Sequence, residues 1–264
     1  MIGLISGFAA IAMYLGGFMH HLWRLRKDPQ FNPRSLQIVV GVAILLHGLA
    51  MIRLLLVDDG LDLSLLKIAG LMALVINTLV FISGLKKPLH SLYLALMPIS
   101  ALSVLAALIS PSTKAVAQMS VTMQTHVLLS VLAYSLLAIA ALQALLSGYQ
   151  NWQLKHKHQN LLMRTLPPMQ TMEALLFEAV WAGWLFLSLS LISGFLFLND
   201  LLGQHLAHKV TFSMVAWSVY GILLWGRHRL GWRGNQAIRW SWAGFIAICL
   251  GYFGSKVVLE FILS

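Results

Sequence analysis

The sequence predicts an all-α fold, a polytopic bundle of about eight transmembrane helices. Of the 264 residues, 59% are hydrophobic and 10% are charged, whereas soluble proteins carry about 25% charged residues. A soluble domain with so few charges could not cover its surface and keep its remaining residues inside. The composition therefore excludes a soluble enzyme, a disordered chain and a disulfide-built secreted module.

The apolar residues fall into runs that are long enough to cross a membrane, which takes about 20 residues of helix. These runs are residues 2–22, 36–57, 65–84, 91–110, 126–147, 178–198, 210–226 and 240–262. The first has no positively charged segment before it and no small-residue cleavage site, so we expect an uncleaved helix and not a signal peptide. Little sequence is left outside the spans, so we expect residues 1–264 to form a single integral membrane domain.

The distribution of Lys and Arg predicts the orientation in the membrane. Thirteen of the 18 lie in the loops after the first, third, fifth and seventh spans, whereas the alternate loops contain two, Lys114 and Lys209. Because positively charged loops stay in the cytoplasm, both termini are predicted to lie outside. The net charge of +10 thus reflects the membrane, and the lipid bilayer is an expected partner whereas nucleic acid is not.

One longer segment interrupts this regular pattern. Residues 148–177 are predicted to form a longer cytoplasmic loop, whose first half continues the fifth helix until Pro167 and Pro168 interrupt it.

The single cysteine, Cys249, excludes an internal disulfide, a CxxC pair and the CxxCH motif for covalent haem.

Two histidines at predicted external helix ends are candidate haem ligands. His126 begins the fifth span and His208 lies just before the seventh, and both helices run from outside to inside. Two imidazoles at matching depth could bind a haem iron from its two sides. Alternatively, each is an interfacial histidine bonded to water or to a backbone carbonyl. His205, one turn before His208, is the substitute ligand.

A third candidate, His47, falls near the middle of the second span. An imidazole there should face the bundle with a partner on its free ring nitrogen. It is a candidate cofactor-binding residue, and a structural hydrogen bond is an equal alternative. Arg53 could pair with Asp58, and Glu178 needs a basic partner from the inner loops.

The remaining histidines have plainer interpretations. His156, His158 and His228 lie in basic cytoplasmic loops, where solvation or lipid headgroups explain them. Three others close or open spans at the inner face, where interfacial placement and ligation are both open: His20, His21 and His90. No nucleophile–base pair, paired-carboxylate site, phosphate-binding glycine loop or HExxH motif is present.

Several segments resemble the cytochrome c assembly family of integral membrane proteins, and its HemX-like branch in particular. They are THVLLSVLAYSLLAIAALQALL (125–146), FEAVWAGWLFLSLSLISGFLF (177–197), HKVTFSMVAWSVYGILLWGRHRLGWRGNQA (208–237), GYFGSKVVLE (251–260) and HGLAM (47–51). The resemblance is strongest over residues 120–262. It implies a multi-pass protein of the bacterial inner membrane that handles haem, with histidines at outer helix ends as the ligands.

The resemblance also bears on the activity. The external loop FLNDLLGQHLAHK lacks the tryptophan-rich WWD segment of the haem-ligating synthases, so the resemblance implies a haem-binding or accessory role in cytochrome assembly and not the covalent attachment of haem to a cytochrome. Haem b held non-covalently, with other membrane biogenesis proteins as partners, is the corresponding expectation.

Two other functions remain open at this stage. A transporter, or an accessory subunit of an ion or metabolite transport system, could use His47, Arg53 and Glu178 to line a polar path. A scaffold subunit without ligand would leave every histidine structural.

Overall fold

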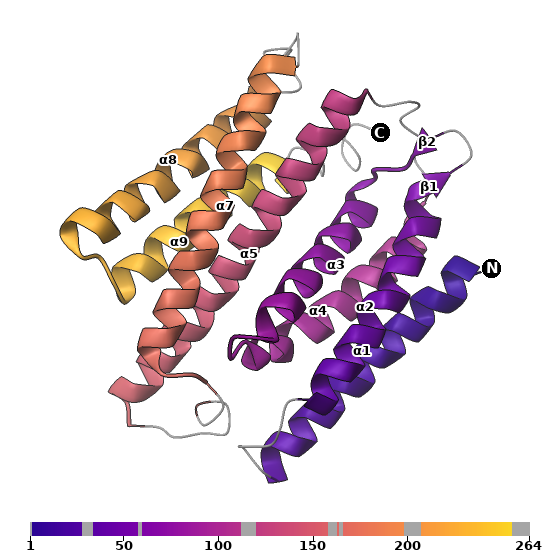
Figure 1. Ribbon diagram of the computed structural model, residues 1–264, viewed down its shortest axis with the longest axis horizontal. Helices are drawn as coiled ribbons and strands as arrows, with labels where there is room; N and C mark the ends of the chain where they lie inside the picture. The colour runs from indigo at the N-terminus through magenta and orange to yellow at the C-terminus, as the bar shows by residue number, and fades with distance from the viewer. Residues whose placement is uncertain are drawn as a thin grey trace. The chain divides into compact units, whose positions relative to one another are not determined.

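The computed structural model describes residues 2–27, 34–57, 60–111, 120–157, 163, 166–197 and 207–254, and these are almost entirely helical (Figure 1). The α-helices are α1 (Ile2–Lys27), α2 (Arg34–Leu55), α3 (Leu65–Gly84), α4 (Tyr93–Ile109), α5 (Val121–Lys155), α7 (Met169–Phe197), α8 (Ala207–Leu230) and α9 (Asn235–Cys249). The other elements are the strands β1 (Leu56–Val57) and β2 (Gly60–Leu61), the 3-10 turn η1 (His90–Leu92) and the π-helix η2 (Leu250–Gly254).

The predicted all-α membrane fold is confirmed. Within the described ranges, six helices are long and apolar enough to cross a membrane: α1, α2, α3, η1 with α4, α5 and α7. Helix α8 covers the predicted span 210–226, and α9 with η2 covers residues 240–254 of the predicted span 240–262, whose remainder lies outside the described residues. The span count of eight and the external placement of both termini stay predictions.

The chain divides into two compact units, which hold α1–α4 and α5–α9. In the first, the helices pack in a closed ring of neighbours, α1 on α2, α2 on α3, α3 on α4 and α4 on α1. In the second, α5 packs on α7 and α9, and α8 packs on the same two helices. Each unit is thus an up-and-down four-helix bundle. In the second unit, α5 and α8 start at the same end (Figure 1).

Serine side chains within the helices donate hydrogen bonds to the backbone of their own helix. Ser147 donates to the Gln143 carbonyl oxygen at 2.8 Å, and Ser188 donates to that of Trp184 at 2.8 Å. A hydroxyl that bonds to the preceding turn has no need of water. Burying these hydroxyls inside apolar helices therefore costs little free energy.

Helix α5 is fastened to the start of α7 by glutamine side chains. Gln150 donates to the Pro167 carbonyl oxygen at 3.0 Å, and Gln143 donates to that of Met172 at 3.3 Å. Because proline cannot continue a helix from the preceding residues, α7 begins just after Pro168. The buried amides fix the angle at which the chain re-enters the bundle.

Close helix approach depends on glycine at particular positions. In α1, a Cβ atom added at Gly17 would lie 2.9 Å from Val39 of α2, whereas one added at Gly16 meets nothing within 4 Å. Packing without a side chain at Gly17 lets the two backbones come together, as small residues do in membrane bundles.

Gly17→Ala should therefore destabilise the protein by about 1–3 kcal/mol through overpacking, and Gly16→Ala should not. Thermal unfolding of both detergent-solubilised variants checks this pair. Equal melting temperatures for the two variants would contradict the packing argument.

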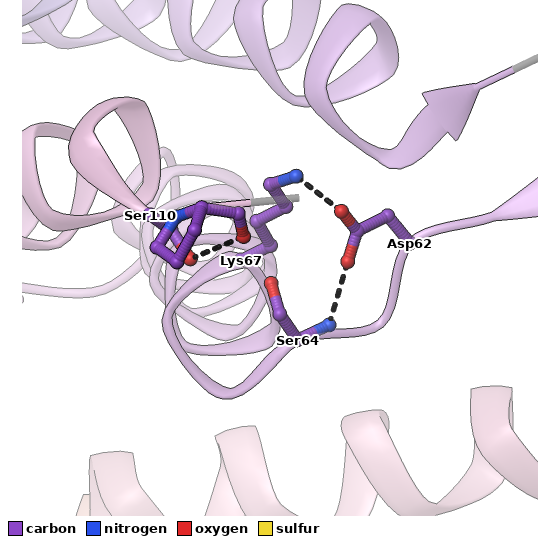
Figure 2. A network of polar contacts seen from close by, with 5 residues as sticks. Asp62, Ser64, Lys67 and Ser110 are labelled. Carbon is purple, nitrogen blue, oxygen red and sulfur yellow. Dashed lines mark hydrogen bonds and ion pairs between the residues drawn. The ribbon is translucent and has the colours of Figure 1, made fainter. Parts of the chain in front are cut away.

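A buried ion pair closes one end of the α1–α4 unit. Lys67, in the first turn of α3, pairs with Asp62, and their side chains are 3% and 0% exposed. Asp62 also accepts a hydrogen bond from the Ser64 backbone N–H at 3.1 Å, as Figure 2 shows. The carboxylate thereby joins the segment after the β1–β2 hairpin to α3.

Lys67→Met should destabilise the protein by about 3–5 kcal/mol, because it leaves a buried carboxylate without its cation. The double variant Asp62→Leu with Lys67→Met should recover much of this loss, since it buries no unpaired charge. Denaturation in detergent measures both. A double variant as unstable as the single one would show that the loss comes from packing and not from charge.

Candidate functional site

His126 lies in the second turn of α5 and is half-buried against α7. Its Nδ1 atom is 3.0 Å from the Ser190 carbonyl oxygen and 3.0 Å from the Ser193 hydroxyl. Ser130, one turn further along α5, bonds to the Ser190 hydroxyl at 2.7 Å. The imidazole is therefore held by a serine-rich stretch of α7 and not by water alone.

The carbonyl partner decides the tautomer of the neutral ring. A carbonyl oxygen only accepts, so Nδ1 of His126 must carry the hydrogen and donate it to Ser190. Nε2 then has a free lone pair, and among the described residues no group bonds to it. A second-sphere bond to a backbone carbonyl is how metal-binding histidines are usually oriented. The described geometry suits His126 to bind a metal through Nε2.

Gly194 makes room for this arrangement. A Cβ atom at position 194 would lie 3.2 Å from Cε1 and 3.6 Å from Nδ1 of His126. The imidazole thus packs directly on the α7 backbone, where a larger side chain would displace it.

Helix geometry brings the start of α8 close to the level of His126. In the antiparallel pair α7 and α8, Trp184 contacts Gly221, and Ser188 accepts from the Trp217 indole. By this register Gly194 lies level with about residue 211 of α8. His208 is then about one helical turn, or about 5 Å, nearer the helix start. The His208 side chain and all of His205 lie outside the described residues.

Aromatic residues line the same end of the bundle. Tyr134 of α5 reaches Ser213 of α8, with 3.4 Å between the hydroxyl oxygens, and its ring meets Tyr252 edge to face at 5.8 Å. Tyr252 belongs to the π-helix that ends α9, a local widening often found at functional sites. Two aromatic rings thus lie in the interior of the α5–α9 unit, further along α5 from its start than His126.

The tryptophans of α7 lie in the middle of the helix. Because α7 begins at Met169 and not at the predicted residue 178, Trp184 is about four turns into the helix. It stacks on Trp217 of α8, with ring centroids 5.5 Å apart, and donates to the Trp217 carbonyl oxygen at 3.0 Å. This pair joins α7 to α8.

His47 is in the other unit and is fully buried. Its Nδ1 lies 3.2 Å from the Tyr14 hydroxyl of α1, and the Gly70 backbone of α3 is its other polar neighbour. The expected partner on a ring nitrogen is thus Tyr14, and the hydrogen-bonded alternative describes the contacts. The prediction that His47 binds a cofactor stays a prediction.

The other ionisable candidates are dispersed. Arg53 and Glu178 are both exposed, and Asp58, the expected partner of Arg53, lies outside the described residues. Arg227 instead pairs with Glu173 and donates to the Trp232 carbonyl oxygen at 3.2 Å. The basic last turn of α8 thus forms part of its contacts within the protein.

Comparison with known proteins identifies the family. Residues 37–263 match the family described as cytochrome C assembly protein. The chain is also 31% identical to the inner membrane protein YpjD of Escherichia coli K12, over 99% of this chain and 98% of the relative. The chain belongs to the cytochrome c assembly protein family.

Other relatives match shorter parts of the chain. The cytochrome c biogenesis protein CcsA of Prochlorococcus marinus is 30% identical over 34% of this chain and 29% of its own length. Protein HemX of Brevibacillus brevis is 24% identical over 49% of this chain and 48% of its own. No solved structure matches significantly. Family membership makes this chain a haem-related, multi-pass membrane protein.

Sequence reasoning missed the serines that hold His126. Ser190, Ser193 and Gly194 match no motif, and isolated serines are common in membrane helices. Their spacing of three and four residues does place them on one helical face, which is the signal that could have found them.

Nitrogen-15 NMR of histidine-labelled protein should show neutral His126 as the Nδ1–H tautomer, because Ser190 offers only an acceptor. The His126→Gln variant assigns the signal. Gly194→Val should shift the signal by displacing the ring from α7. A neutral Nε2–H tautomer would contradict the described hydrogen bond.

Proposed function

We propose that this protein binds haem at the predicted external end of the α5–α9 unit, with Nε2 of His126 as an iron ligand. The observation that carries the proposal is the bond between Nδ1 and the Ser190 carbonyl, which leaves Nε2 free to bind. Family membership supports haem as the group bound. We assign the protein to cytochrome assembly or a related step of haem-dependent biogenesis.

His208 is the proposed second ligand. Helices α5 and α8 start at the same end and occupy opposite corners of the helix ring, since each packs on α7 and α9. A ligand between them would be approached from two sides, as bis-histidine binding requires. His205, one turn earlier, is the alternative second ligand.

Haem would be held without a covalent bond. The only cysteine is Cys249, on α9, and the chain has no CxxCH motif. The proposed cofactor is therefore haem b, which would supply a redox-active iron when bound. Around it, Ser190 and Ser193 orient His126, while the rings of Tyr134 and Tyr252 offer an apolar surface to the macrocycle.

The relatives support a setting for this function. YpjD is named an inner membrane protein and CcsA a cytochrome c biogenesis protein. We infer that this protein lies in a bacterial inner membrane and works with other membrane biogenesis proteins. The predicted orientation would open the haem site to the external side.

The purified wild-type protein should show a Soret band, or gain one when haem is added. His126→Ala should lower haem affinity by at least about tenfold, and Gly194→Val by about 10–100-fold, because an oriented ligand is lost or displaced. Absorption titration with haem measures both.

His156→Ala is the matched control, because His156 is exposed and bonded to its own helix at the Trp152 carbonyl oxygen. It should bind haem like the wild type. A wild-type protein that never gains a Soret band would overturn the proposal, and equal loss in both alanine variants would remove His126 as the ligand.

A further inference from the structure

A layer of buried polar side chains crosses the middle of the α1–α4 unit, and each of the four helices contributes to it. Tyr14 of α1 meets His47 of α2 at 3.2 Å. Asn77 of α3 donates to the Ser100 hydroxyl of α4 at 2.6 Å. All four residues are fully buried. Such groups are costly inside a membrane and are therefore candidates for function.

The packing at Gly17 shows that these two pairs lie at the same level along the helix axes. A Cβ atom at Gly17 would lie 3.2 Å from Cε of Met97. Because α1 and α4 are antiparallel, moving three residues along each helix brings Tyr14 level with Ser100. His47 is reached by the Tyr14 side chain from this level. The two pairs therefore form one layer.

A second polar layer lies one heptad nearer the predicted inner face. Tyr93 is seven residues before Ser100 on α4, and His21 is seven residues after Tyr14 on α1, so each layer is about 10 Å from the other. Tyr93 and His21 are both buried. His21 lies near His90, and Tyr93 lies near Tyr14. His90 is partly exposed, so this layer reaches the surface of the unit.

Each layer contains a buried polar atom without a protein partner. The Asn77 Oδ1 atom and the Tyr93 hydroxyl make no hydrogen bond within the described part of the chain. The Asn77 amide cannot be turned to relieve this, because its Nδ2 atom already donates to the Ala73 carbonyl oxygen at 2.7 Å. Buried polar atoms of this kind are normally satisfied by bound water.

We propose that the interior of the α1–α4 unit is a water-binding site, open to the predicted inner face, through which His47 exchanges protons with that side. Water enters beside His90 and bonds to Tyr93, then to Asn77. From there Tyr14 relays protons to His47. Met97 is the side chain between the layers, and its unbranched, flexible chain allows water to pass. This site is independent of the haem site in the other unit.

Cysteine accessibility tests the water. In a Cys249→Ala background, Ser100→Cys is compared with Ala107→Cys, which lies seven residues further along the same face of α4 and is equally buried. A small charged methanethiosulfonate is added to inside-out and right-side-out vesicles. These reagents react with the thiolate, which forms only where water reaches the sulfur.

Ser100→Cys should react at least about tenfold faster than Ala107→Cys, and faster when the reagent is added to the predicted inner face. Equal rates for the two cysteines would overturn the proposal. Faster reaction from the opposite face would overturn the assigned opening.

Proton exchange is measured on the wild-type protein. Uniformly nitrogen-15-labelled protein in liposomes is transferred to deuterated buffer, and His47→Gln serves only to assign the His47 N–H signal. The signal should disappear at least about tenfold faster than the backbone amides of α2. Persistence as long as those amides would overturn the proposal, whichever way the cysteine variants behave.

Discussion

The absence of water in the hydrocarbon core is the constraint on which this structure depends. Backbone N–H and C=O groups there must be satisfied within the segment, and helices achieve this. Side chains follow the same rule, since Ser147 and Ser188 bond to the preceding turn of their own helices. Other polar groups bond to a second helix, as Tyr14 of α1 does to His47 of α2.

The contact between His126 and α7 follows from this constraint and also sets the tautomer of the neutral imidazole. Ser190 supplies a carbonyl oxygen to the histidine although that residue is in a helix, and Ser193 adds a hydroxyl. The ring gains a fixed tautomer from the bonds that let it be partly buried. One interaction therefore both orients the imidazole and satisfies a polar residue inside the bundle, and Gly194 makes this possible by leaving the α7 backbone uncovered.

The two units use buried polarity differently. In the α5–α9 unit it lies towards both ends of the bundle, beside His126 and at the glutamines that hold the start of α7. In the α1–α4 unit it occupies interior layers, as at Tyr14 and His47, and a closing ion pair between Asp62 and Lys67. A buried ion pair offers little net stability by itself, but losing one partner is costly. The Asp62–Lys67 pair therefore fixes the path of the chain into α3 more than it adds stability.

The sequence by itself determined the fold class and the membrane setting, because hydropathy and charge distribution are properties of single segments. Helix ends were less accessible: α7 begins nine residues before the predicted 178, because buried glutamines hold its polar first turns against α5. Only the tertiary structure showed Ser190 as the partner of His126 and Tyr14 as the partner of His47. Each pair joins different helices, and the period of one helix carries no information about which residues of another will face it.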